Sequence, residues 1–220
     1  MVLVYVAPEV EQVLALHPYL NDAEFRKLSI VEQLKMQADT LRIAHVNGDR
    51  RIAMQVRSWW PKAANKSLDD IMIGTFAQSD AALTICREYG FSNWNSVQSL
   101  GDLAPEPEFE QALNIMLAGE IDQFEQHLIS TPHLATAQAR YGHQATLLHY
   151  LGANGVESHR QMTPLNAAEL AQILISMGAS KQAQANMYGG GQTPLALAST
   201  SAHPYKAGIS DALNRVMQPD

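Results

Sequence analysis

The chain is poor in cysteine and in long apolar runs. Cys86 is the one cysteine among 220 residues, which excludes a disulfide within the chain and favours a reducing compartment. No stretch approaches the roughly 20 apolar residues that a membrane-spanning helix needs. The apolar run at residues 2–7 is short and follows no basic segment, as a signal peptide would require. We therefore expect a cytoplasmic protein with no membrane partner.

Positive charge is scarce as well. The chain has 15 lysines and arginines against 22 acidic residues, a formal net charge of −7. A surface that binds phosphates needs clustered basic residues, whereas the adjacent pair Arg50-Arg51 is typical of a solvated helix face. Nucleic acid is therefore not an expected partner.

Two short motifs indicate where helices begin. Thr146-Leu147-Leu148-His149 and Thr193-Pro194-Leu195-Ala196 each open a segment of helical periodicity. Threonine is a good helix N-cap and proline suits the first helical position, which also favours a helix start at Thr163-Pro164. We predict that His149 is structural, because it lies over the helix face of Thr146 and can bind its hydroxyl or the backbone of a neighbouring repeat.

Other segments predict further helices. Apolar residues recur at helical spacing over 166–177, with Gly178 at the position of a left-handed C-cap. In the N-terminal half, we expect a helix from Pro8 to Leu16, a cap at Asn21-Asp22, and a capping box at Ser29 to Glu32 that opens a helix towards Val46. Residues 43–61 and 114–132 share one order of features, a predicted helix, a glycine followed by an acidic residue, a second predicted helix and a proline. This shared order indicates duplication.

Between these helices, residues 135–143 and 181–191 end in turn signals and predict two projecting hairpins. The second hairpin has Gly189-Gly190-Gly191 at its tip. A glycine-rich loop before a helix can hold phosphate, but no strong strand precedes it and no Lys-Ser/Thr pair follows, so a hairpin tip is favoured.

Taken together, the motifs resemble those of bacterial ankyrin-repeat proteins. The resemblance rests on the Thr146 and Thr193 motifs and on an upstream element close to Ala-Arg-Glu-Tyr-Gly-Phe-x-x-Trp, here Cys86-Arg87-Glu88-Tyr89-Gly90-Phe91-Ser92-Asn93-Trp94. It covers residues 34–217 and implies protein binding, with no cofactor. We expect Cys86, and Trp94 with Phe91, to be buried.

The expected fold is all-α, an ankyrin-like helical-repeat solenoid with a helical N-terminal region. Residues 101–108 contain two prolines and few large apolar side chains, which makes them the best linker candidate. We therefore expect a helical region with a degenerate repeat at 1–103 and ankyrin-like repeats at 104–220. Because repeats must stack to bury their apolar faces, most of their recurring residues are architectural.

Residues 153–162 are unusual, since an ankyrin repeat has a tight turn there. Glu157, His159 and Arg160 could form a binding lip, with Tyr141 and Tyr188 of the two hairpins as aromatic anchors. Alternatively, these polar groups could pair with one another and brace the fold. The lip hypothesis predicts that Arg160→Ala weakens partner binding without affecting stability, whereas the brace hypothesis predicts loss of stability.

The function expected from the sequence is therefore that of a protein-binding module whose partner is a protein of unknown identity. A metal-dependent or hydrolytic enzyme is the alternative, with histidines and Glu157 in the repeat loops as candidates; the histidines are His143, His149, His159 and His203. None of them has the spacing of His-Glu-x-x-His, and the chain has no Gly-x-Ser-x-Gly element. We accordingly expect no catalytic residue, no metal ligand and no cofactor.

Overall fold

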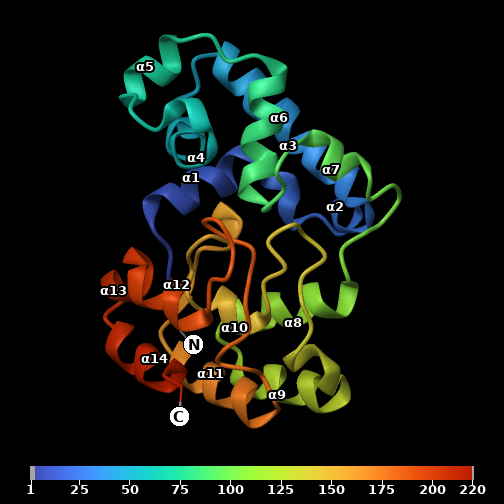
Figure 1. The fold of residues 1–220 in the computed structure, drawn as a ribbon, viewed down its shortest axis with the longest axis vertical. Helices are drawn as coiled ribbons and strands as arrows, with labels where there is room; N and C mark the ends of the chain where they lie inside the picture. The colour runs from blue at the N-terminus through green and yellow to red at the C-terminus, as the bar shows by residue number, and fades with distance from the viewer. Residues whose placement is uncertain (1–2, 220) are drawn as a thin grey trace. The chain divides into compact units, whose positions relative to one another are not determined.

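The structure is a computed structural model that describes residues 3–219 (Figure 1). It is predominantly helical, as expected from the sequence, and contains one short two-stranded sheet among these residues. The chain divides into two compact units, Pro8–Pro105 and residues 106–219 together with residues 3–7. None of the described helices is long and apolar enough to cross a bilayer.

The unit Pro8–Pro105 is built around α3 and α6, which pack against each other. Its helices are α1 (Pro8–Leu16), α2 (Ala23–Lys27), α3 (Ile30–Val46), α4 (Ala53–Trp59), α5 (Leu68–Ile73), α6 (Gln78–Glu88) and α7 (Trp94–Gln98).

Local caps explain where several of these helices begin. The Ser29 hydroxyl accepts from the amide of Glu32, and a Glu32 carboxylate oxygen accepts in return from the Ser29 amide at 3.0 Å, which confirms the predicted capping box of α3. Asp22 caps α2 by accepting from the Glu24 amide at 2.9 Å. The sequence therefore determines these helix starts through contacts only two or three residues apart.

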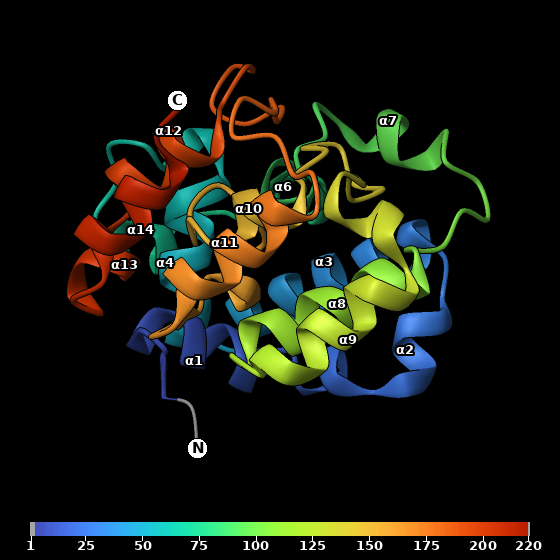
Figure 2. The ribbon, with the colours of Figure 1, turned by 90° about the horizontal axis from the view of Figure 1, so that it is seen from below.

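The second unit contains three successive helix pairs (Figures 1 and 2). The pairs are α8 (Pro107–Leu117) with α9 (Ile121–Ser130), α10 (Leu147–Tyr150) with α11 (Ala167–Ser176), and α12 (Pro194–Thr200) with α14 (Ser210–Met217). In the chain, α13 (Ala202–Lys206) lies between α12 and α14. Successive pairs pack together, α9 on α11, α11 on α14 and α10 on α12, so the unit has two helical layers.

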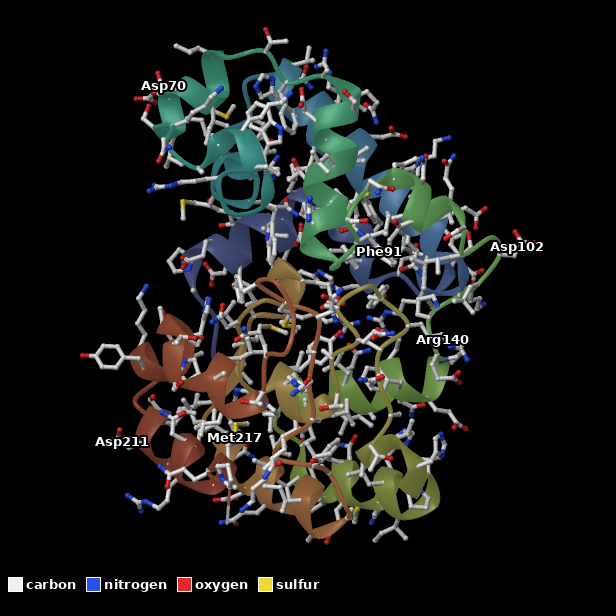
Figure 3. All side chains as sticks on the ribbon, in the orientation of Figure 1. Asp70, Phe91, Asp102, Arg140, Asp211 and Met217 are labelled. Atoms are coloured by element: carbon white, nitrogen blue, oxygen red, sulfur yellow. The ribbon has the colours of Figure 1, made fainter. Side chains whose placement is uncertain are left out.

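Buried apolar side chains hold these layers together. The ring centroids of Phe109 on α8 and Tyr150 on α10 are 6.3 Å apart, and both residues are buried. On α14 the side chain of Met217 points into the unit while that of Asp211 points outward (Figure 3). This one-sided burial is the pattern expected of helices that must stack to cover their apolar faces.

The two predicted hairpins are present between the pairs. An antiparallel bridge joins Gln138 to Thr146 in the first, and another joins Ala185 to Gln192 in the second. The hairpins also contact each other, because the backbone amide of Asn186 donates to the backbone carbonyl oxygen of His143 at 2.7 Å.

Thr163-Pro164 does not begin a helix, contrary to the sequence-based expectation. These residues form strand β2 (Thr163–Pro164), which pairs antiparallel with β1 (Val4–Tyr5), and α11 begins three residues later at Ala167. The extended backbone pairs with a strand that lies far away in sequence, and this pairing overrides the local helix-start signal.

Trp94 also differs from expectation. Phe91 is buried, at 8% exposure, and Cys86 is fully buried, as predicted. Trp94 is only half-buried, because it starts α7 and stands on the wall of an open groove. The turn at Gly90 therefore packs only one of the two aromatic side chains into the core.

Candidate functional site

His149 joins the start of α10 to the second hairpin, which contains Gln192. Its Nδ1 accepts from the Thr146 amide at 3.1 Å and lies 2.8 Å from the Thr146 hydroxyl, while its Nε2 lies 3.1 Å from the carbonyl oxygen of Gln192. Since Nδ1 accepts an amide proton, the ring proton is on Nε2 and is donated to Gln192. The predicted structural hydrogen bonds of His149 are thus confirmed.

Thr146→Val is expected to reduce the free energy of unfolding by about 1 kcal/mol, the usual size of a lost cap. Urea unfolding of the purified variant measures this change. Thr136→Val is the matched control, because Thr136 is exposed and its hydroxyl donates only to a nearby carbonyl. Equal stability of the two variants would contradict the role given to Thr146.

Glu157 lies in the interior of the unit, in the segment 153–162. Its side chain is fully buried; one carboxylate oxygen accepts from the Tyr150 hydroxyl at 3.1 Å, and the other is 3.6 Å from His143 Nε2. His143 Nδ1 accepts from the Ala145 amide at 3.0 Å, so its Nε2 carries the proton that faces Glu157. Glu157 therefore connects the segment to α10 and to the first hairpin.

Arg160 connects the same segment to α8. Its guanidinium forms an ion pair with Glu110 and donates to Asn114 Oδ1 at 2.9 Å. Glu110 and Asn114 are four residues apart on α8 and so lie on one helix face. Arg160 is only 8% exposed, which makes this a largely desolvated ion pair.

Neighbouring charges shift the pKa values of this interior cluster, whose members are Glu110, Asn114, His143, Tyr150, Glu157 and Arg160. Burial by itself raises the pKa of Glu157, but His143 and Arg160 outweigh it and lower the pKa to about 2. Burial by itself lowers the pKa of Arg160, but Glu110 and Glu157 raise it above its usual range. Glu157 and Arg160 therefore both remain charged at neutral pH.

These positions change the interpretation of the predicted lip. Tyr141 is 6% exposed, with its ring centroid 5.7 Å from that of His143, so Tyr141, Glu157 and Arg160 do not offer their side chains to a partner in this structure. The contacts of Glu157 and Arg160 are those of the brace. His159 is half-buried and Tyr188 exposed, and their partner-binding roles stay predictions.

Tyr188 is the predicted site residue that reaches the surface. Its side chain is 64% exposed, its φ is +50°, and its hydroxyl donates to Asn154 Oδ1 at 2.7 Å. Gly155 has φ +75°, and a Cβ there would lie 2.8 Å from Met187 Sδ and 3.0 Å from the Tyr188 ring, so glycine suits both its backbone and this approach. The strained backbone of Tyr188 is thus held in place by the segment 153–162.

The second hairpin carries no charged side chain after Lys181. Exposure alternates along residues 182–188, with Gln182, Gln184, Asn186 and Tyr188 outward and Ala185 and Met187 buried. No Asp, Glu, Lys or Arg occurs from residue 182 to residue 202. Residues 182–188 therefore present amide groups and one aromatic ring to solvent.

Sequence analysis missed three members of the interior cluster, Glu110, Asn114 and Tyr150. The spacing of Glu110 and Asn114 on one face of a mostly apolar helix was the available signal. Within the part of the chain that the structure describes, no three His, Cys, Asp or Glu residues are grouped so that they could hold a metal ion.

Comparison of the chain with protein-family models, with curated proteins and with solved structures finds no match.

Proposed function

We propose that residues 104–220 form an ankyrin-like repeat stack that serves as a cytoplasmic protein-binding module. The observation that carries the proposal is the His149 bridge, in which one ring binds the threonine that opens its own helix and the backbone of the next hairpin. Such a bridge couples one repeat to the next, which a stack of dependent repeats requires.

The order of elements supports the same proposal. A helix pair followed by a hairpin occurs twice, and a third helix pair follows. Thr146 and Thr193 are further apart than the roughly 33 residues of an ankyrin repeat. The buried brace at 153–162 lies between them and accounts for added length without interrupting the packing of α10 on α12.

A protein partner would contact the hairpin side of this stack. Tyr188 is a large aromatic ring held in one conformation, and preorganised aromatic side chains are typical of binding hot spots. To test this, a photo-crosslinking phenylalanine analogue is placed at position 188 in the full chain, in cells of the source organism. Position 205 is the matched control, since Tyr205 is an exposed tyrosine of the same unit, at 77%.

A protein adduct that forms from position 188 and not from position 205 is the expected result. Adducts in equal yield from both positions, or from neither, would contradict binding at the hairpin.

With the crosslinked partner identified, we expect Tyr188→Ala to weaken binding by more than about 1 kcal/mol, because the aromatic contact is lost. Isothermal titration calorimetry measures this change, and the melting curve should stay nearly unchanged, as for other exposed positions. Tyr205→Ala should leave the affinity as it is. An affinity unaffected by Tyr188→Ala would assign the contact to other residues.

A further inference from the structure

Among the described strands β1 pairs with β2 alone, which leaves one edge of β1 without a strand. In an antiparallel pair, residues that exchange both backbone hydrogen bonds alternate with residues whose N–H and C=O groups point away from the other strand. Pro164 has no N–H, so its pair with Val4 is of the second kind. The Leu165 amide accordingly donates to the carbonyl oxygen of Leu3 at 3.0 Å. Within residues 3–219 nothing forms a hydrogen bond with the Val4 backbone, which therefore offers a donor and an acceptor to a further strand.

The opposite edge of this small sheet is closed to pairing. Pro164 lies at that edge and has no donor to offer, and proline at an edge is one of the features that prevent strands from adding to a sheet. β1 has no such feature, since residues 3–7 contain no proline and no charged side chain. A strand added to this sheet would therefore pair with β1.

The side chains beside the open edge are apolar and partly exposed. Leu3 and Leu165 are 65% and 39% exposed, and the register of β1 with β2 places them side by side. Tyr5 points to the same face as Leu3, because side chains alternate along a strand, and Val4 and Val6 point to the other face. Valine and tyrosine are also residue types enriched in strands. The strand that fits this edge is accordingly uncharged and apolar on both faces.

We propose that the open edge of β1 pairs antiparallel with β1 of a second copy of this chain. A two-fold axis at Val4 lets the two Val4 residues exchange both backbone hydrogen bonds, since each has its donor and its acceptor free. The same axis places Leu3 of each copy opposite Tyr5 of the other, a cross-strand pair that covers the exposed leucine. β1 is itself an uncharged strand that is apolar on both faces, so one segment supplies both halves of the interface.

Sedimentation equilibrium of the full chain from about 1 μM to about 1 mM tests this proposal. Paired strands this short form a small interface, so we expect the average mass to rise with concentration from that of a monomer towards that of a dimer. Val4→Pro should stay monomeric, because it removes the outward N–H at a position where an edge strand tolerates proline. Leu3→Lys should do the same, since lysine blocks strand edges. Ile129→Lys is the matched control, because Ile129 is also 65% exposed in the same unit, and it should dimerise as the wild type does.

A wild-type chain that stays monomeric at every concentration, or whose mass rises beyond that of a dimer, would overturn the proposal. So would association that Val4→Pro and Leu3→Lys retain, or that Ile129→Lys loses as well. The melting curves of the variants at low concentration should match that of the wild type, because the bond to Leu165 uses the Leu3 backbone and not that of Val4.

Disulfide trapping tests the register without relying on a loss of association. Across a hydrogen-bonded antiparallel pair the Cα atoms are about 5.5 Å apart, a separation that a disulfide bridges. Val4→Cys, oxidised by air with copper phenanthroline, should therefore give a covalent dimer, whereas Ser176→Cys, at an exposed position of the same unit, should not. Cys86 is fully buried and present in both variants, so it should not react. Equal yields from the two variants would contradict pairing at Val4. None of these outcomes depends on Tyr188, so this proposal and the proposed function fail or succeed separately.

Discussion

Arg160→Ala lowers the free energy of unfolding by about 3 to 5 kcal/mol, the cost of breaking a buried ion pair by removing one partner. Glu110, whose side chain is 12% exposed, would lose its ion pair with the Arg160 guanidinium, and Asn114 would lose the donor to its Oδ1. For a chain of this size, such a loss corresponds to a fall in melting temperature on the order of 10 °C. Thermal unfolding followed by circular dichroism measures it.

Two further variants make this prediction specific to the buried charge. Arg215→Ala changes an exposed arginine of the same unit and should alter stability by less than about 0.5 kcal/mol. The double variant Glu110→Gln, Arg160→Met removes both charges, so it should be more stable than Arg160→Ala. This comparison holds even if the single variant fails to fold. A wild-type melting temperature for Arg160→Ala would overturn the brace.

Acid is expected to remove the contribution of His149 to stability. Burial lowers the pKa of His149 from 6.5 to about 4, against the smaller opposing influence of the Gln192 carbonyl. The folded-state pKa is thus below the unfolded value, so the unfolded chain takes up a proton first as the pH falls. The contribution is complete above pH 6.5 and is lost by about pH 4. At about 1.4 kcal/mol per pKa unit, it amounts to about 3 kcal/mol.

Urea unfolding of the wild type and of His149→Asn at several pH values isolates this contribution. Burial also lowers the pKa of His17 to about 4, but His17 is present in both proteins and its effect cancels in the difference. The stability difference should shrink as the pH falls from 7 to 4. Glu157, with a folded-state pKa of about 2 against 4.5, adds a second loss below pH 4.5 in both proteins. A difference that is constant with pH would contradict the prediction.

The sequence predicts the local parts of the fold best. The capping box of Ser29 with Glu32, the helices from Pro8, Ile30 and Ala167, and the two hairpins follow from residues a few positions apart. Thr193 accepts from the Ala196 amide at 3.2 Å, again as its helix-start motif predicts. At these positions the decisive hydrogen bonds form within one helical turn, so nearby residues are sufficient to predict them.

The candidate site was predicted in part. The sequence singled out Glu157, Arg160 and Tyr188 because a tight turn does not need such side chains. It left open whether the charged pair faces a partner or the interior. In the structure the charged residues Glu157 and Arg160 are buried, whereas the aromatic residue Tyr188 is exposed.

By itself, then, the sequence determined the helical class, the helix starts at Ser29 and Thr193, and a structural role for His149 with Thr146 among its possible partners. Only the tertiary structure decided that Thr163 pairs with Tyr5, that Arg160 reaches Glu110, and that Trp94 opens onto a groove. The physical reason is that each of these outcomes depends on a partner from another segment. A residue's own neighbours do not specify which distant strand, charge or helix will desolvate it, and the burial of a charge or an aromatic ring depends on that desolvation.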